Sequence, residues 1–430
     1  MIIPTIDLMN GKLVQLEKGE KKLIELDSPL VFAKQYSKYA LVQLIDLDSA
    51  LGKGDNFEIV KEICKIVPCR VGGGVRTVEN AIELVNAGAK KIIIGTKANK
   101  EFLMGLGNAI GKEKIIVALD ARNGKVSIEG WQKETNTSPS QLAKELEEYC
   151  SEFLYTSVDK EGLLKGADLD TVKELQKVTK NKISLAGGIN SIEEIKVLDK
   201  LGVDAVTGLA VYSGKFSAEQ AFIEVLDFEK QNGLIPTIIQ EKNETVLSLV
   251  YSSKESLAKT LEFGKVWTYS RSRKGIFQKG ATSGNVQELI RVSVDCDKDA
   301  LIFTVLQKGK SPAGDGVACE TGQYSCFGTE KQFDLQALYN KVLDRKKNAQ
   351  EGSYTKKLFD DELLLKRKLI EEAAEVITAK NKEELVWECA DLLYFLFVIM
   401  ANGGVSILEV EKENQRRDNV KKSTVGAVGK

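Results

Sequence analysis

The chain contains no histidine in its 430 residues, so it lacks the commonest imidazole metal ligand and acid–base side chain. It also lacks any apolar run of the ~18 residues expected of a membrane-spanning helix. The net charge is −1, which gives no argument for binding nucleic acid or an anionic membrane. The seven cysteines are odd in number and unevenly spread, which argues against a disulfide framework and predicts reduced thiols in a cytoplasmic protein.

Over residues 1–230, the sequence alternates short apolar runs with helical patterns. The apolar runs lie at 2–7, 41–48, 69–75, 91–96, 115–121, 153–159, 183–188 and 205–210. Eight strand–helix units in this length predict a (β/α)₈ TIM barrel.

Two further regions follow the predicted barrel. Residues 231–244 have the composition of a linker, and 245–330 change to a pattern of strands and turns, which predicts a small, mostly-β domain. Residues 331–430 are nearly all helix-forming and predict an all-α domain, with helices at 334–348, 362–379 and 382–402. The sequence therefore predicts a multidomain protein.

The barrel region contains an internal repeat. The stretch "GGGVRTVENAIELVNAGAKKIIIGT" (72–96) parallels "AGGINSIEEIKVLDKLGVDAVTGLA" (186–210), and Gly73 matches Gly187 at an offset of 114 residues. The barrel is therefore predicted to consist of two half-barrels of four units each.

Asp7 and Asp120 occupy matching positions in the two halves, 113 residues apart, and each ends a predicted strand. The carboxyl ends of barrel strands face the active site. Two carboxylates in unlike surroundings there are suited to act as an acid and a base. The alternative is that each aspartate caps the following helix or holds a loop.

Glycines at other strand ends predict phosphate binding, because glycine-rich turns expose backbone N–H groups to an anion. The two sets are Gly73, Gly74, Gly95 and Thr96 in the first half, and Gly187, Gly188 and Gly208 in the second. One site per half implies a substrate with a phosphate at each end. The alternative is that these glycines only form tight turns.

The motifs "PTIDLMNGKLVQL", "VGGGVRT", "ALDARNGKVSIEGW" and "AGGINSIEEI" resemble the phosphoribosylformimino-AICAR-phosphate isomerases of histidine biosynthesis over about the first 215 residues. The family converts an aminoaldose to an aminoketose. The resemblance implies that Asp7 is the base at the sugar C2 and that Asp120 is the acid at the ring oxygen. It also implies that Thr156 assists the acid and that Arg76 and Trp131 contact the substrate.

One motif departs from this family, because its usual Asp-Gly-Thr is replaced by Glu161-Gly162-Leu163. Two alternatives to a dedicated isomerase stay open. The barrel could bind without catalysis and serve as a scaffold, or it could also accept phosphoribosylanthranilate, which undergoes the same rearrangement.

The middle region combines basic and hydroxyl side chains suited to a phosphorylated ligand. These are Arg271, Arg273, Lys279, Thr282 and Ser283. Three thiols follow, Cys296, Cys319 and Cys326, one ligand short of a structural zinc site, which predicts a catalytic Zn²⁺ with an open position. Buried apolar thiols are the alternative.

Three acids in the same stretch, Asp295, Asp297 and Asp299, alternate along a predicted strand and would share one face. Carboxylate oxygens suit Mg²⁺, and a solvated strand edge is the alternative. The motifs "YSRSR", "KGATSG", "DCDKDA" and "ACETGQYSCF" resemble phosphoribosyl-AMP cyclohydrolase.

That resemblance implies that the three cysteines hold zinc across a dimer interface, that the acids bind Mg²⁺, and that the reaction opens the purine ring by hydrolysis. Three positions depart from the family: Ala281 replaces a common Glu, and Asn285 and Glu320 replace histidines. We expect Glu320 to accept the proton in place of imidazole.

The helical region carries acids that predict a second Mg²⁺ site, bound together with a polyphosphate. Glu371, Glu372 and Glu375 lie on one predicted helix, and Glu388 and Asp391 on the next. Like charges spaced in this way destabilise a helix unless a cation neutralises them. The alternative is a solvated acidic face.

The spacing of these acids, with "SYTKKLF" (353–359) and Lys368, resembles phosphoribosyl-ATP pyrophosphohydrolase over about 332–425. A histidine of that family is Phe395 here. The three resemblances name consecutive steps and imply a trifunctional enzyme that acts on small phosphoribosyl nucleotides, without nucleic acid or membrane. They also imply a homodimer formed through the cyclohydrolase and pyrophosphohydrolase domains.

Overall fold

The computed structural model describes residues 1–308, 323–328, 333–348, 352–411, 413–414 and 417. Cys319 and Glu320 of the predicted metal site lie outside these residues. The chain divides into two compact units, Met1–Gly328 and Thr329–Lys430. Each unit is described by itself.

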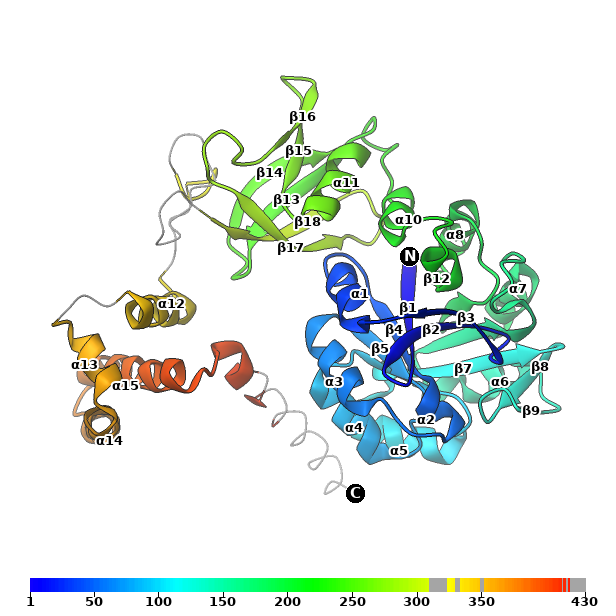
Figure 1. Ribbon diagram of the computed structural model, residues 1–430, viewed down its shortest axis with the longest axis horizontal. Coiled ribbons are helices and arrows are strands. Elements are labelled where there is room, and N and C mark those ends of the chain that lie inside the picture. Colours follow the sequence, from blue (N-terminus) through cyan, green and yellow to red (C-terminus); the bar gives the residue numbers. More distant parts are fainter. Residues whose placement is uncertain (309–322, 329–332, 349–351, 412, 415–416, 418–430) are drawn as a thin grey trace. The chain divides into compact units, whose positions relative to one another are not determined.

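The first unit begins with a closed barrel of eight parallel strands, which confirms the predicted TIM barrel (Figure 1). The strands pair in chain order, and the last pairs with the first, Ala205 lying opposite Ile2. They are β1 (Ile2–Met9), β4 (Val42–Asp46), β5 (Cys69–Gly72), β6 (Lys91–Ile94), β7 (Ile115–Arg122), β10 (Glu152–Ser157), β11 (Lys182–Ala186) and β12 (Asp204–Thr207).

Two antiparallel extensions that were not predicted leave the barrel at equivalent points. One follows β1 and the other follows β7, so each continues a strand that carries a predicted catalytic aspartate. The strands are β2 (Lys12–Glu17), β3 (Lys21–Leu26), β8 (Lys125–Ile128) and β9 (Lys133–Glu134). The twofold repeat therefore extends beyond the barrel strands.

Helices surround the barrel, and their ends repeat with the sequence. Thr77 caps α4 and Ser191 caps α8, each accepting a hydrogen bond from a backbone N–H of the first turn, and the two caps lie 114 residues apart. The helices are α1 (Pro29–Tyr36), α2 (Leu47–Leu51), α3 (Phe57–Ile66), α4 (Val78–Ala87), α5 (Lys100–Ile110), α6 (Pro139–Leu146), α7 (Leu169–Val178), α8 (Ile192–Lys200), α9 (Leu209–Tyr212) and α10 (Ala218–Glu224), with 3₁₀ turns at Lys112–Lys114, Glu147–Tyr149 and Val158–Lys160.

A second sheet of six strands follows, as predicted for a mostly-β region, with the order β16-β15-β14-β13-β18-β17. Its elements are β13 (Ile235–Glu241), β14 (Val246–Ser252), β15 (Trp267–Ser270), β16 (Gly275–Gln278), β17 (Gln287–Val294), β18 (Leu301–Gln307) and the helix α11 (Lys254–Phe263). Its buried residues belong to the same continuous apolar cluster as those around the barrel, which explains why the two form one unit.

The prediction of a linker over 231–244 was wrong for 235–241. These residues form β13, which pairs with β14 on one side and with β18 on the other. Ile235, Thr237 and Ile239 are buried in alternation, as a strand inside a sheet requires. The sequence of these seven residues did not reveal the strand, because the two strands that pair with it lie later in the chain.

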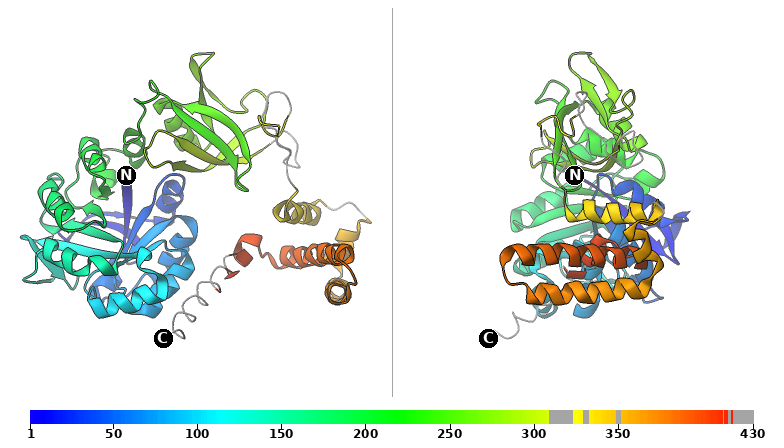
Figure 2. Two further views of the ribbon diagram at one scale, coloured as in Figure 1. Left: turned by 180° about the vertical axis from the view of Figure 1, so that it is seen from behind. Right: turned by 90° about the vertical axis from the view of Figure 1, so that its left-hand side faces the viewer.

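The second unit is helical, as predicted, and comprises α12 (Leu335–Lys347), α13 (Tyr354–Asp360), α14 (Glu362–Thr378) and α15 (Lys382–Gly403). Figure 2 shows α14 and α15 lying side by side, and they are in contact. The core of this unit gathers mainly on the second half of α15, around Phe397 and Val398. Among the described residues, no helix is both long and apolar enough to cross a membrane.

Candidate active sites

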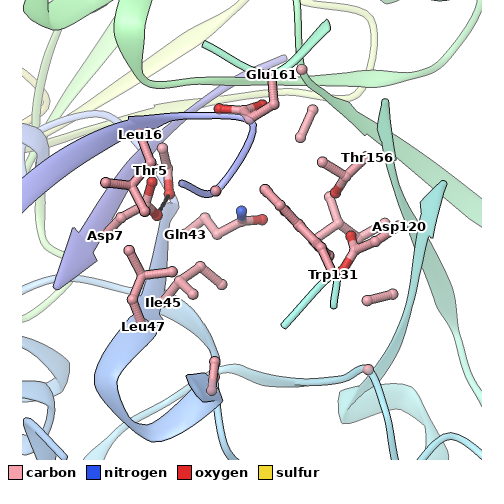
Figure 3. A pocket seen from close by; sticks show the side chains of 18 of the residues that line it. Thr5, Asp7, Leu16, Gln43, Ile45, Leu47, Asp120, Trp131, Thr156 and Glu161 are labelled. Carbon is pink, nitrogen blue, oxygen red and sulfur yellow. Dashed lines mark hydrogen bonds between the residues drawn. The ribbon is translucent and has the colours of Figure 1, made fainter. Parts of the chain in front are cut away.

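A cavity of about 220 Å³ opens at the carboxyl ends of the barrel strands. Figure 3 shows Asp7 and Asp120 on its opposite sides. Every barrel residue predicted for the site lines this cavity: Asp7, Gly73, Gly74, Arg76, Gly95, Thr96, Asp120, Trp131, Thr156, Gly187, Gly188 and Gly208. The fold brings the predicted set together, while the role of each residue stays a prediction.

Asp7 lies near the end of β1, half-buried in the cavity wall. Its carboxylate accepts hydrogen bonds from Thr5 Oγ1 at 2.6 Å and from Gln15 Nε2 at 3.1 Å. Burial nevertheless raises the pKa of Asp7 to about 6, against these two hydrogen bonds, which lower it. The group is therefore a weak base that is mostly ionised at neutral pH.

Asp120 lies at the matching position in β7, next to Thr156 of β10 in the strand register. Burial raises the pKa of Asp120, while hydrogen bonds from Thr156 and Trp131 act in the opposite direction. Trp131 belongs to the extension that follows β7, and its ring packs against Gly19 of the extension that follows β1. A Cβ at Gly19 would lie 2.7 Å from Trp131 Cε3. The two extensions therefore meet over the cavity.

Glu161 is a third carboxyl group in the same cavity, and sequence reasoning missed it as a functional residue. Its pKa is raised to about 8, first by burial and then by the negative charges of Asp7 and Asp120. Figure 3 shows its side chain above the two aspartates, with Asp7 on the left and Asp120 on the right. The sequence showed that the usual Asp-Gly-Thr motif is altered here, but it did not show that Glu161 lies in the cavity.

The paired glycines have the same conformation in both halves of the barrel. Gly73 has φ +90° and Gly187 has φ +91°, and a Cβ would lie 2.1 Å from Asp46 O at the first and 2.6 Å from Ser157 O at the second. Any side chain would therefore clash with main chain at either position. These tight turns place backbone at the cavity wall on both sides, which is compatible with two bound phosphates.

The second sheet carries the predicted phosphate-binding side chains on two neighbouring loops. Arg271 and Arg273 lie between β15 and β16, with the Arg271 guanidinium 4.0 Å from the ring centre of Tyr251. Lys279, Thr282 and Ser283 lie between β16 and β17. All but the half-buried Lys279 are exposed, so their ends are available to a ligand.

The acids Asp295, Asp297 and Asp299 do not lie on a strand, which corrects the prediction. They lie in the turn between β17 and β18, because β17 ends at Val294 and the chain reverses there. One carboxylate oxygen from each lies within 4.8 Å of the others. Three hard oxygen donors at this spacing fit Mg²⁺.

The predicted zinc ligands are described only in part. Cys296 is exposed in the same turn as the acids, and Cys326 is exposed after β18. Their third partner, Cys319, lies outside the described residues. Accessible thiols fit a zinc-binding role better than the alternative of buried apolar thiols.

In the second unit, Glu372, Glu388 and Asp391 bring carboxylate oxygens within 4.8 Å of one another across α14 and α15. Burial raises the pKa of Glu372 and of Glu388, and Glu375 raises both further. Glu371 is not part of this group and pairs with Lys368 at 2.9 Å, and Lys368 also lies 3.9 Å from Glu372. The donor set again fits Mg²⁺.

A cavity of about 740 Å³ lies beside these acids and contains Glu372, Asp391 and Phe395 in its wall. Arg345 lines it as well and was missed from the sequence, since it sits among many basic residues of α12. Phe395 is buried between the rings of Tyr354 and Tyr394, so it fills space rather than binding metal.

Comparison with known proteins agrees with this geometry. A family model described as "Histidine biosynthesis protein" matches residues 1–217. The chain belongs to this family. Models of phosphoribosyl-AMP cyclohydrolase and phosphoribosyl-ATP pyrophosphohydrolase match residues 248–328 and 335–418.

Individual relatives of this histidine biosynthesis protein are of two kinds. It is 41% identical to an imidazole-4-carboxamide isomerase of Methanocaldococcus jannaschii over 232 residues, 51% of this chain and 97% of that protein. A Methanococcus maripaludis isomerase is 42% identical over 232 residues, 51% of this chain and 98% of that protein. The histidine biosynthesis trifunctional protein of Neurospora crassa is 31% identical over 362 residues, 83% of this chain and 38% of that protein.

Proposed function

We propose that this chain carries out three consecutive steps of histidine biosynthesis. The helical unit releases pyrophosphate from phosphoribosyl-ATP, the second sheet opens the purine ring of phosphoribosyl-AMP, and the barrel isomerises the product. The single observation that supports this proposal is that the models of all three families match this one chain, one after another. The trifunctional Neurospora relative aligns with 83% of it.

For the barrel, we propose that Asp7 accepts the proton from C2 of the aminoaldose. Its pKa of about 6 leaves it ionised at neutral pH yet basic enough to take a proton. Asp120, on the opposite wall, would donate a proton to the ring oxygen. The two glycine turns would bind the phosphates at the two ends of the substrate, which places the sugar between the aspartates.

Glu161 is a second candidate for the acid. Its pKa of about 8 keeps it protonated at neutral pH, which an acid requires before reaction. Burial and then the charges of Asp7 and Asp120 hold that proton in place, so in this alternative both aspartates are ionised and Glu161 carries the proton.

For the second sheet, we propose that Cys296, Cys319 and Cys326 hold Zn²⁺ and that the acidic turn holds Mg²⁺. The zinc would supply a water of lowered pKa for hydrolysis. Arg271, Arg273 and Lys279 would hold the phosphate of the nucleotide, and Glu320 would accept the proton.

For the helical unit, we propose that Glu372, Glu388 and Asp391 hold Mg²⁺, which neutralises their mutual repulsion and supplies charge for the polyphosphate. Arg345 lies in the same cavity and would bind a phosphate directly. Lys368 lies beside these acids, 2.9 Å from Glu371 and 3.9 Å from Glu372, and would bind a phosphate as well.

We also propose a homodimer. Leu363, Ile370 and Ile377 lie seven residues apart on α14 and are 66%, 71% and 84% exposed, and Trp387 on α15 is 71% exposed. An apolar stripe at heptad spacing is suited to packing against a second copy. Among the described residues, Cys64, Cys69, Cys150, Cys296 and Cys389 are free thiols, which fits a reducing compartment, and we propose the cytoplasm.

The test is to supply the purified chain with phosphoribosyl-ATP, Mg²⁺ and Zn²⁺ and to identify the products by chromatography. We expect the aminoketose. If the products stop at phosphoribosyl-AMP, the function proposed for the second sheet is wrong, and if they stop at the aminoaldose, the function proposed for the barrel is wrong.

A further inference from the structure

The turn that carries Asp295, Asp297 and Asp299 is fastened to the barrel. Lys298, at the centre of the turn, has φ +65° and places its Nζ 2.5 Å from both carboxylate oxygens of Asp199, near the end of α8. Its carbonyl oxygen accepts a hydrogen bond from Asp227 N at 2.9 Å. Side chain and main chain of one residue therefore hold the acidic turn against barrel elements.

A second lysine lies among the acids themselves. Lys230, in the segment that joins α10 to β13, places its Nζ 2.7 Å from Asp297 Oδ2 and 3.1 Å from Asp299 Oδ2. The third acid, Asp295, directs Oδ1 to the backbone N–H groups of Asp299 and Ala300. Two of the three carboxylates thus share one ammonium group that comes from outside the sheet.

We propose that Lys230 sets the divalent-cation affinity of the acidic turn by competing for its oxygen atoms. This inference rests on the proposed function, in which these acids hold Mg²⁺. A cation that binds Asp297 and Asp299 must displace the ammonium group from oxygens only 2.7 and 3.1 Å away. If both remained, the two positive charges would repel at close range.

The competition is moderate because the lysine is 43% exposed and water screens it. Removing its charge should tighten cation binding about three- to tenfold. Because thermodynamic linkage is reciprocal, cation binding must weaken the interaction of Lys230 with the acids of the turn by the same factor. Lys298 and Asp199 keep the turn in place, while the segment around Lys230 is released.

The barrel segment thereby becomes part of the cation site of the neighbouring sheet. A cation bound in the turn would free the segment around Lys230, which joins the isomerase barrel to the second sheet. Without a cation, the ion pairs of Lys230 hold this segment against the turn. The device depends on both regions being in one chain, because the lysine precedes β13 and the acids follow β17.

The test is a calorimetric titration of the full-length chain with Mg²⁺, in a background with Glu388→Gln and Asp391→Asn so that the helical unit does not contribute. Mg²⁺ is used because thiolates bind it poorly. In this background, Lys230→Met should bind Mg²⁺ three- to tenfold more tightly, and Lys230→Arg should bind it as the parent does.

The matched control is Lys254→Met. Lys254 is 49% exposed and pairs with Glu224 of α10 from α11, so it also bridges the two regions but does not touch the acids. It should leave Mg²⁺ binding unchanged. A direct readout of displacement is the acetylation rate of Lys230, followed by mass spectrometry, which should rise when Mg²⁺ is added while that of Lys254 stays constant.

Asp297→Asn distinguishes a failure of the competition by Lys230 from a failure of the proposed metal site. If this variant loses Mg²⁺ binding but Lys230→Met leaves the affinity unchanged or weakened, the competition is disproved and the metal site stands. If Asp297→Asn binds Mg²⁺ as well as the parent does, the acidic turn is not the site, and the metal assignment and the inference both fall.

Discussion

Arg70 of β5 and Glu152 of β10 form a buried ion pair across the base of the barrel. Both are almost fully inaccessible, at 0% and 3% exposure. Arg70 also donates to Gln43 at 2.8 Å and to Ser184 at 3.0 Å, so it links two further strands, β4 and β11, and Gln43 in turn lines the cavity. No motif in the sequence indicates this cluster.

Replacing Arg70 with Ala should lower the free energy of unfolding by about 3–5 kcal/mol, because it leaves an unfilled space and leaves buried Glu152 with only Lys91 and the Ser184 hydroxyl as partners. Thermal unfolding of the full chain measures this. Lys61→Met, which removes an exposed pair, is the control and should change little. A small effect of Arg70→Ala would contradict the assigned role, and Arg70→Met with Glu152→Leu should recover much of the loss.

Asp7→Asn should lower the isomerase kcat by roughly 10²–10⁴-fold, since the amide cannot accept a proton. Steady-state kinetics with the aminoaldose measures this, with Asp170→Asn on the outer helix α7 as the control for the charge change. Unchanged turnover in Asp7→Asn would mean that the barrel does not use this base.

The isomerase should have a bell-shaped dependence of kcat/KM on pH. Activity should fall below pH about 6 as Asp7 takes up a proton, and above pH about 8 as Glu161 loses one. Glu161→Gln has no proton to donate, so kcat/KM should fall at every pH if Glu161 is the acid, whereas loss of the alkaline fall alone would assign the acid role to Asp120. An unchanged alkaline limb would show that another group carries it.

Gly187→Ala should raise the KM of the isomerase and destabilise the barrel by about 2–5 kcal/mol, because its Cβ meets Ser157 O and the residue has a positive φ. Gly202→Ala is the matched control. Its φ is +71° but nothing lies within 4 Å of the added Cβ, so it should cost only about 1–2 kcal/mol and leave KM unchanged. Equal effects on KM would argue against a phosphate at Gly187.

Glu388→Gln should reduce pyrophosphate release from phosphoribosyl-ATP by roughly 100-fold, because one carboxylate of the proposed Mg²⁺ site is lost. Phosphoribosyl-AMP supplied directly should still be ring-opened at the normal rate. Glu383→Gln on the same helix should have no effect. Loss of both activities in Glu388→Gln would indicate damage to the fold rather than to the site.

The eight barrel strands and their repeat could be predicted because their signals are local. Each strand is a short apolar run between polar helical patterns, and the turns at Gly73 and Gly187 need glycine for reasons of backbone geometry alone. The same is true of the helix caps Thr77 and Ser191. Asp7 and Asp120 could be predicted as site residues for a related reason, since each follows a recognisable strand.

Other features depend on contacts between distant residues. β13 is a strand because β14 and β18 pair with it, and the acids of 295–299 lie in a turn because β17 stops at Val294. Neither outcome is encoded within a window of ten residues. The exposure of Trp387 likewise depends on tertiary contacts, because only the second half of α15 packs into a core.

The barrel, the two later regions and the kinds of residue proposed to bind substrate and metal could be predicted from the sequence, because strand runs, glycine turns and acid spacings are properties of neighbouring residues. Which charges face one another follows from the fold. Glu161 gains its high pKa from burial and then from aspartates that lie 154 and 41 residues earlier, and Lys230 reaches acids 67 and 69 residues later. Electrostatic interactions depend on distance in space, which the order of residues does not contain.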